Sequence, residues 1–572
     1  MKRLYTYLVS MVAIAATLVG CSKDSNKGDY KCAVPNEAAV VVRFDINQVL
    51  VKGGLKSELI NMLRSKLRQE GAPEMFVNMA SDLRNTGVDV EAPMYAFAQL
   101  VDDDNIFVGV VAKTYKKELL DKVVAFVPDL PKSQESGCTY LHIEDDVAFA
   151  YNEVAVVFGG VAPLVSKQYE VNCYGEYVPV ERTHKYIDLK PLLIGALKDA
   201  ANCSGGAVLP AYEGNDLAAC LRVEPILKAA KELADAELKH ASSRKRAEVY
   251  SALHLAEAAK SGRIDVALNF ADGSVSLDAM ASGFPKPEGL QLEPCSNENL
   301  KDISANAWAV ANLPIDGAML ADVITKMLEN HPELQGALDA ALGREFNNRS
   351  MNVDAVVKSF KNVVLASISS IKGDLTIALN SYSEEQYWDS NCGDYGVYRT
   401  RANVDALAMV NVTNENIIKV VDAVQAFANT GLEQNGYNCY RAVVDGVGVN
   451  FGLDQKQLYA KTDYISYVET PATSASWYSA VQGSYGYVVV NLSSLLADPN
   501  IKREVEGALS NKYGYSSSYG SAIKLVKSLD YLLLTAPSPN SLSLQLVLKN
   551  KKENALKQIV NEVKPLVNNN KW

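Results

Sequence analysis

The sequence predicts an α+β protein built from antiparallel-sheet units that are covered by helices on one face and arranged as two tandem halves. Two observations lead to this fold class. A phrase made of an apolar strand, a polar residue and a helix start occurs four times, and hairpins rather than regular strand–helix–strand alternation lie between these phrases. The four polar residues are Asp45, Glu224, Asn312 and Asn491.

An offset of 267 residues links the two halves. Asp45 and Asn312 are 267 positions apart, and so are Glu224 and Asn491. A hairpin pattern over residues 264–277, with Asp272-Gly273 at its turn, recurs over residues 529–544. Asp-Gly between alternating apolar runs is a strong hairpin signal. The shared offset predicts a tandem duplication in which each half contains two related units.

The polar residue of each phrase is predicted to cap the helix that follows. A short carboxylate or amide at this place accepts hydrogen bonds from the first free N–H groups of a helix. A catalytic acid or base is the alternative. The exchange among Asp, Glu and Asn favours the capping interpretation.

Further elements follow from local periodicity. The predicted strands and hairpins cover residues 95–100, 106–112, 147–158 and 443–453, and the predicted helices cover 116–127, 189–200, 225–239, 317–328 and 415–428. The turn at 102–105 contains three aspartates, but their spacing is not that of a calcium loop. We therefore expect no metal there.

Clusters of turn residues set the expected boundaries. They separate residues 35–205 and 206–288 in the first half from 289–469 and 470–572 in the second. A signal peptide over residues 1–20 and a flexible tether over 21–34 precede these units.

The N-terminus has the pattern of an export signal. Lys2 and Arg3 precede an apolar run over 4–20, and the run ends in Leu-Val-Gly followed by Cys21. This ending resembles the bacterial lipobox, which implies that Cys21 is acylated and anchors the chain to a membrane. An uncleaved membrane span is the alternative, but about 20 apolar residues are needed for one, and this run is shorter and partly polar.

The residues after the cysteine add to this resemblance. Ser22-Lys23-Asp24 resembles the short signal that takes Bacteroidota lipoproteins to the cell surface, although a generic linker of a periplasm-facing lipoprotein explains it as well. With the lipobox and the strand–polar–helix phrases, the chain resembles the domain-of-unknown-function 4836 group of Bacteroidota lipoproteins. The resemblance implies a location at the outer membrane and brings no catalytic residues.

Composition limits the partners. The chain has 56 basic and 67 acidic residues, a net charge of −11, which argues against nucleic acid or anionic lipid head groups as the main partner. Five histidines occur, and none has the spacing of a zinc site. No catalytic residue, cofactor or metal is predicted.

Eight cysteines remain beside Cys21, and their spacing leaves the pairing open. An exported chain permits disulfides. Cys220 lies inside an apolar run, which favours a small buried side chain rather than a bridge.

The halves differ by insertions at 161–206 and 381–402. The second insertion is rich in aromatic and acidic residues, and Tyr387, Trp388, Asp389 and Tyr395 form a candidate site for a protein or glycan ligand. A hairpin packed on the second half is the alternative. The sequence favours a non-enzymatic envelope lipoprotein that binds a partner, with a structural or assembly factor, or an envelope hydrolase whose acids meet only in the fold, as alternatives.

Overall fold

The computed structural model divides into two compact units. Unit 1 takes in Met1–Pro285 and Lys551–Asn561, and unit 2 takes in Lys286–Asn550 and Glu562–Trp572. The structure describes residues 28–568 except 70, 72–73, 80–82, 103–104, 126–129, 145, 165–166, 172–176, 182–186, 204–207, 239–241, 286–292, 331–361, 363, 390–396, 416, 419–432, 437, 445–446, 464–467 and 515. The signal peptide and Cys21 therefore lie outside the described residues.

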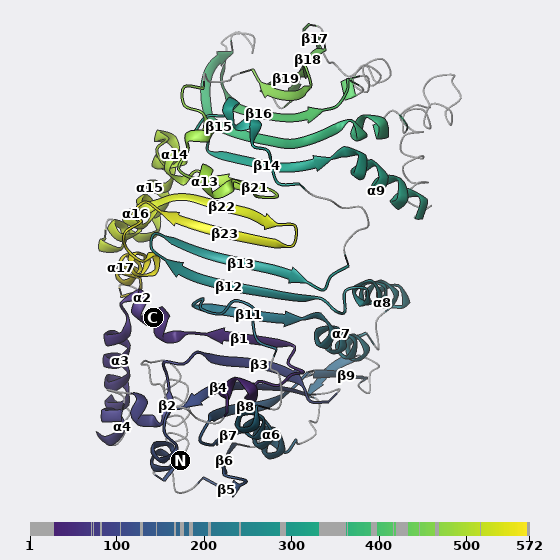
Figure 1. Cartoon of the computed structure of the whole chain (residues 1–572). Coiled ribbons are helices and arrows are strands. Elements are labelled where there is room, and N and C mark those ends of the chain that lie inside the picture. Colours follow the sequence, from purple (N-terminus) through teal and green to yellow (C-terminus); the bar gives the residue numbers. More distant parts are fainter. Residues whose placement is uncertain are drawn as a thin grey trace. The chain divides into compact units, whose positions relative to one another are not determined.

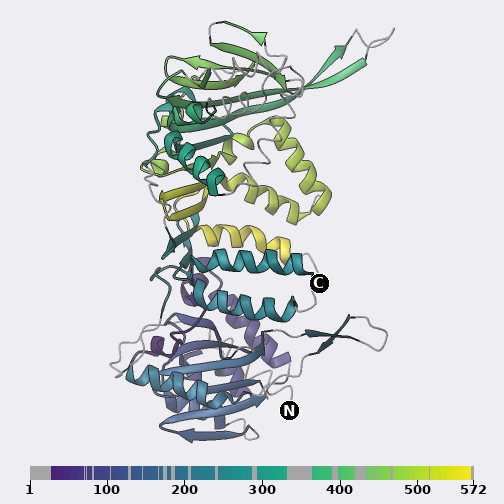
Figure 2. The same ribbon diagram turned by 90° about the vertical axis from the view of Figure 1, so that its right-hand side faces the viewer.

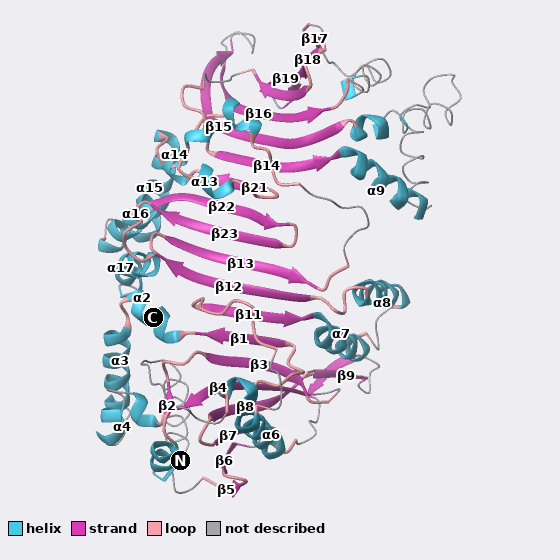
Figure 3. Ribbon diagram, viewed as in Figure 1, coloured by secondary structure: helices cyan, strands magenta, loops and turns pink. Residues whose placement is uncertain are grey.

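Unit 1 contains an antiparallel sheet (Figure 1, Figure 3). In the described part of unit 1, ten strands pair edge to edge in the order β13, β12, β11, β1, β3, β4, β8, β7, β6, β5, and the short β2 also pairs with β4. A separate hairpin joins β9 and β10. The strands are β1 (Val40–Phe44), β2 (Val88–Asp89), β3 (Met94–Leu100), β4 (Asn105–Thr114), β5 (Lys132–Glu135), β6 (Cys138–Glu144), β7 (Val147–Tyr151), β8 (Ala155–Pro163), β9 (Lys167–Val171), β10 (Tyr177–Glu181), β11 (Leu217–Arg222), β12 (Arg263–Ala271) and β13 (Ser274–Ser282).

Helices pack on both faces of this sheet. The helices are η1 (Tyr30–Ala33), α2 (Ile46–Gly53), α3 (Lys56–Gln69), α4 (Glu74–Met79), η2 (Leu83–Thr86), α5 (Lys117–Ala125), α6 (Leu189–Asn202), α7 (Val223–Glu237) and α8 (Ser243–Glu257). One core joins α2, α3 and α5 to Met94 and Phe149. The other joins η1 and α6 to Val41 and Phe97 on the opposite face.

The end of the predicted tether belongs to the folded unit. Tyr30 and Ala33 are buried against α6, and the Asp29 N–H donates to the Ala200 carbonyl at 3.1 Å. A disulfide joins Cys32 to Cys203. Residues 29–33 of the predicted tether are therefore part of the folded unit, because Tyr30 and Ala33 complete a core.

Unit 2 contains a sheet with the same strand order. In its described part, ten antiparallel strands run β23, β22, β21, β14, β15, β16, β20, β19, β18, β17. The strands are β14 (Ala309–Asp316), β15 (Ile371–Asp389), β16 (Val397–Val412), β17 (Glu433–Gln434), β18 (Cys439–Val444), β19 (Val447–Asp454), β20 (Gln457–Thr462), β21 (Tyr487–Val490), β22 (Leu529–Ser538) and β23 (Ser541–Leu548).

One face of the unit 2 sheet packs on a single core. Val310, Val489 and Leu533 meet the fully buried Trp477 and residues of the loops around η3 and η4. The helices are η3 (Glu298–Asp302), α9 (Gly317–Asn330), η4 (Ala472–Ser474), α13 (Tyr478–Val481), α14 (Leu492–Leu495), α15 (Pro499–Tyr513) and α16 (Ser517–Ser528), and α17 (Ala555–Asn568) begins in unit 1 and ends in unit 2.

The paired strands β1 and β11 of unit 1 match β14 and β21 of unit 2 at an offset of 269 residues, whereas the pairings of the next strands do not keep one offset. Val41 pairs with Cys220, and Val310 pairs with Val489 in the corresponding strands.

The capping prediction is right for two of the four residues. Asp45 accepts from the Gln48 N–H at 3.0 Å and Asn491 from the Ser494 N–H at 3.1 Å, each at the start of a helix. Glu224 lies in the first turn of α7, where Arg222 is the N-cap residue.

Asn312 is not a cap. It lies in the middle of β14 and is fully buried, and Asp316 accepts from the Met319 N–H at the start of α9. The strand continues past the polar residue, because buried partners satisfy the amide of Asn312.

Most of the remaining predicted elements agree with the structure, but the prediction of helices on one face of each sheet is wrong for unit 1, where helices pack on both faces. The α+β class, both hairpins at 264–277 and 529–544, and the helices at 189–200, 225–239 and 317–328 are confirmed. The helix predicted at 415–428 lies almost entirely outside the described residues. Of the helices that the structure describes, none is long and apolar enough to span a membrane.

Candidate functional site

The predicted aromatic site lies on a two-stranded arm. Beyond Leu379 and Leu407, the described parts of β15 and β16 pair only with each other. Figure 2 shows this arm projecting from the sheet of unit 2. The side chains from Glu384 to Gln386 are exposed in this segment, and the alternative of a hairpin packed on the second half stays a prediction.

Trp388 and Tyr398 are the described aromatic pair of this arm. They face each other across the two strands, with ring centroids 4.8 Å apart in an edge-to-face arrangement, and both rings are more than half exposed. Tyr387 and Asp389 lie in β15 beside Trp388, but their side chains are outside the described residues, and so is Tyr395. A ligand site made by these four residues stays a prediction.

The face of the unit 2 sheet opposite its core is open and apolar. Directly paired residues form a row across five strands, from Leu544 through Leu534, Val488 and Ala311 to Ile377. The four larger side chains of this row are each more than a third exposed. Leucine, valine and isoleucine thus line the solvent side of a sheet whose other side is already filled.

This surface carries only aliphatic side chains over β14, β15, β21, β22 and β23. We call it the open face; it consists of Ala309, Ala311, Leu313, Ile315, Leu375, Ile377, Leu379, Val488, Val490, Leu532, Leu534, Leu542, Leu544 and Leu546. Antiparallel sheets with one face toward water normally place polar residues on that face. A contiguous exposed apolar patch on a protein marks a binding surface.

The corresponding face of unit 1 is only partly covered. Phe44 and Met94 on this face pack against α2, α3 and α5, whereas Ile264, Leu277 and Val108 are exposed. The helices that follow β1 and β4 thus cover the apolar side chains near them. The apolar side chains of β12 and β13 on the same face have no such cover. Unit 2 presents the larger uncovered surface.

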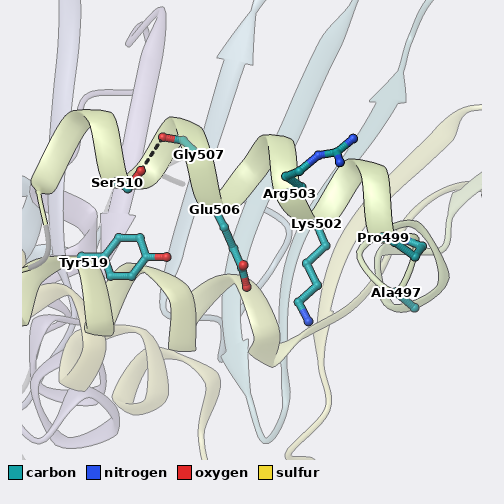
Figure 4. A pocket seen from close by; sticks show the side chains of 8 residues that line it. All are labelled: Ala497, Pro499, Lys502, Arg503, Glu506, Gly507, Ser510 and Tyr519. Atoms are coloured by element: carbon teal, nitrogen blue, oxygen red, sulfur yellow. Dashed lines mark hydrogen bonds between the residues drawn. The ribbon is translucent and has the colours of Figure 1, made fainter. Parts of the chain in front are cut away.

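A pocket lies between α15 and α16 in unit 2 (Figure 4). Its wider part has a volume of about 510 Å³ and is lined by Lys502, Glu506 and Tyr519 among others. A narrower part of about 190 Å³ shares Lys502 and Glu506 and is walled by Val505 and Ile523. The pocket exists because α15 has no buried residue and the buried residues of α16 are two serines and an alanine.

The most densely bonded polar cluster of unit 2 is internal. Asp374 is buried, and its Oδ2 accepts from the Ser296 hydroxyl at 3.1 Å, the Asn297 N–H at 2.9 Å and the Asn312 amide at 3.1 Å. The Tyr487 hydroxyl donates to Asn297 Oδ1 at 2.7 Å. With its donors and acceptors paired inside the protein, this cluster holds the loop before β14 against the sheet.

Unit 1 has charged residues that are buried as deeply as Asp374 of unit 2. The Lys52 ammonium lies 2.8 Å from Oδ2 of the fully buried Asp216 and donates to Asn269 at 3.1 Å. Arg43 is buried and donates to the Asn215 carbonyl. Lys52 thus forms an ion pair with a fully buried carboxylate, and the Arg43 contact is a hydrogen bond to the backbone.

The described cysteines divide into one bridge and four free thiols. Cys220 is buried and free, as the sequence predicts. Cys138 and Cys295 are also buried, and Cys439 is half-buried. Burial and the nearby Asp374 raise the pKa of Cys295 to about 12, so this thiol is a protonated core residue and not a nucleophile. Among the described residues, no group of three or more His, Cys, Asp or Glu is placed to hold a metal ion.

Comparison with known proteins bears on unit 2. The family model described as a domain of unknown function, DUF4836, matches residues 301–556. Residues 301–556 form a DUF4836 domain. The predicted resemblance to this family is confirmed for that range, and the DUF4836 domain contains the whole open face and the pocket between α15 and α16.

The other comparisons add little to the DUF4836 domain. None of the curated protein sequences matches the chain. A solved structure entitled "Structure of crystal form I of TP0453" aligns with 46% of this chain and 83% of its own, at 12% identity and a TM-score of 0.22. A likeness at this level supports no inference.

Sequence reasoning missed the open face, although its signal was present. Val488-Val489-Val490 and Leu532-Leu533-Leu534 are continuous apolar runs, which are typical of strands apolar on both faces. The pocket had no comparable signal, because small residues between two helices form a cavity only once the helices are packed.

Proposed function

We propose that this chain is a lipid-anchored, non-enzymatic protein of the cell envelope that holds the hydrocarbon chain of a lipid against the open face of unit 2. Acylated Cys21 would keep the body at the outer membrane, facing either the cell surface or the periplasm. The observation that carries the proposal is the exposed row from Leu544 to Ile377.

The chemistry of the open face favours hydrocarbon over a protein partner. Protein interfaces combine an apolar centre with a polar rim, are enriched in aromatic residues and arginine, and form about one hydrogen bond per 100–200 Å². The open face has neither an aromatic nor a hydrogen-bonding side chain. A saturated chain needs only contact and exclusion of water, which aliphatic side chains provide.

The dimensions of the open face suit an extended chain. Neighbouring strands lie about 4.8 Å apart, so the five-strand row from Leu544 to Ile377 is about 19 Å long. Burial of apolar surface contributes about 25 cal/mol per Å². A lipid chain along this row would therefore remove its own surface and that of four exposed aliphatic side chains from water.

The proposal includes a tandem duplication of the body. It is supported by the identical strand order of the two units and by matching buried pairs, Val41 with Cys220 and Val310 with Val489. Within this scheme the unit 1 sheet kept helices over part of the equivalent face, and unit 2 left that face open.

The test uses the full chain and a hydrocarbon without a head group. Diphenylhexatriene fluorescence should rise on titration into the Cys21→Ser chain, and Ile377→Asp with Leu534→Asp should weaken this binding about tenfold or more, because charged groups would have to be desolvated under the probe. The matched control is Lys372→Asp, which adds a carboxylate to β15 on the other face. Equal binding by the open-face variant and the control would refute the proposal.

Anchoring is tested by expressing the wild-type and Cys21→Ser chains in bacteria and separating the membranes. The wild-type chain should sediment with membranes, and the Cys21→Ser chain should not. The chain could instead form a dimer through the open face that dissociates in Ile377→Asp, while the monomer binds no probe. That result would show that the open face binds a second copy of the chain and not hydrocarbon.

A further inference from the structure

We propose that the pocket between α15 and α16 binds an amphiphile with an anionic head, a carboxylate or a phosphate, on a hydrocarbon tail. The proposal concerns other residues than the open face and adds a charged group to the chemistry of the ligand. The observation behind it is that both lysines and aliphatic side chains line this pocket.

Two ammonium groups, those of Lys502 and Lys527, line the pocket and could contact the head of such a ligand. Lys502 points into the space between the helices, whereas Arg503 points away from it (Figure 4). Lys527 lines the narrower part and lies 3.7 Å from the Glu506 carboxylate. Within the described residues Lys502 has no ion-pair partner. One lysine is thus balanced by Glu506 and the other is left for an external anion.

The acidic groups near the mouth do not cancel this charge. Glu506 carries one negative charge among the lining residues, against the lysines at 502 and 527. Asp498 precedes α15 and is engaged as its N-cap, accepting from the Asn500 and Ile501 N–H groups at 2.9 and 3.1 Å. The pocket is therefore locally positive in a chain whose net charge is −11.

The narrower part of the pocket offers an apolar surface for the tail. Four aliphatic side chains line the narrower part of the pocket: Leu496, Val505, Ile523 and Val526. Val505, Ile523 and Val526 are only half-buried, so a tail would complete their burial. The hydroxyl of Tyr519 is directed toward Glu506 at the mouth, which adds a hydrogen-bonding group beside the head (Figure 4).

The experiment measures binding of decanoate, decyl phosphate, decanol and inorganic phosphate to the full Cys21→Ser chain by calorimetry. We expect both decyl anions to bind about tenfold or more tightly than decanol, and inorganic phosphate alone to bind weakly, since head and tail contribute together. Preference for decyl phosphate over decanoate would assign the head to a phosphate, and the reverse to a carboxylate.

The decisive variant is Lys502→Glu, with Lys524→Glu as its matched control. Lys524 is exposed on α16 and does not line the pocket. Lys502→Glu should weaken binding of the decyl anions about tenfold and leave decanol unchanged, whereas Lys524→Glu should change neither. Val526→Trp should weaken all tailed ligands by filling the narrower part.

Three results would overturn the inference. They are equal effects of Lys502→Glu and Lys524→Glu, equal affinity for decanol and decanoate, and inorganic phosphate binding as tightly as decyl phosphate. The Lys502 effect is also measured in the Ile377→Asp chain, where it should persist. Loss of hydrocarbon binding at the open face and loss of anion selectivity at the pocket are therefore separate outcomes.

Discussion

Units 1 and 2 order their strands alike but fill the same buried position with different chemistry. At the register position where β1 of unit 1 has Arg43, β14 of unit 2 has Asn312. Arg43 bonds a backbone carbonyl near the ion pair of Lys52 and Asp216, whereas Asn312 joins an amide and carboxylate cluster around Asp374. Strand order depends on the alternation of apolar residues and on turns. The buried polar residues do not set it and can therefore differ between the units.

The units also differ in what secures their edges. Unit 1 closes its N-terminal segment onto α6 with a disulfide, whereas the described part of unit 2 has none. Unit 1 covers part of one face with α2, α3 and α5, and unit 2 leaves its open face to solvent. Unit 1 therefore has a cross-link and covering helices that the described part of unit 2 lacks.

The largest expected effect comes from the disulfide. Cys32→Ser with Cys203→Ser opens a loop of 171 residues and should lower the free energy of unfolding of unit 1 by about 5 kcal/mol. Hydrogen exchange during urea unfolding, read separately for each unit, measures it. Cys439→Ser in unit 2 is the control. Equal destabilisation of both units would break the comparison.

The next effect comes from Asp374. Asp374→Ala removes the acceptor of three buried or partly buried donors and should cost unit 2 about 3 kcal/mol or more. Asp463→Asn, at an exposed pair with Arg441, should cost at most about 1 kcal/mol. Tryptophan fluorescence measures the chemical unfolding of both variants, because all four tryptophans belong to unit 2. Similar losses would mean that the cluster does not hold the core.

The smallest effect, about 1.4 kcal/mol at pH 10, is a pH dependence of unit 2. Burial raises the pKa of Cys295 from an ordinary value of 9 to about 12, so the folded thiol keeps its proton where the unfolded thiol loses it. Stability is therefore full below pH 9 and falls by about 1.4 kcal/mol per pH unit between 9 and 12. Cys295→Ala should reduce this slope in unit 2 and leave unit 1 unchanged. An unaltered slope would exclude Cys295 as its source.

Local patterns explain which elements the sequence predicted. Asp272-Gly273 fixes a two-residue hairpin, and the periodicity after Pro225 and Gly317 marks α7 and α9, because turns and amphipathic helices are written in neighbouring residues. Asn312 looked like a cap for the same reason. Its partners at 297 and 374 are distant in sequence, so no local pattern showed that the strand continues.

The candidate site was predictable only in part. Trp388 could be named because aromatic residues gather around it in the sequence, and its pairing with Tyr398 is a hairpin contact. The row from Leu544 to Ile377 joins strands far apart in the chain. Each strand reads as apolar, but the sequence does not say which face is left uncovered.

The sequence by itself determined the α+β class, the repeated strand–polar–helix phrases and most hairpins, since these depend on spacings of a few residues. Only the tertiary structure decided the pairing of Cys32 with Cys203, the open face and the pocket between α15 and α16. These features depend on which distant segments pack together and which surface they leave bare.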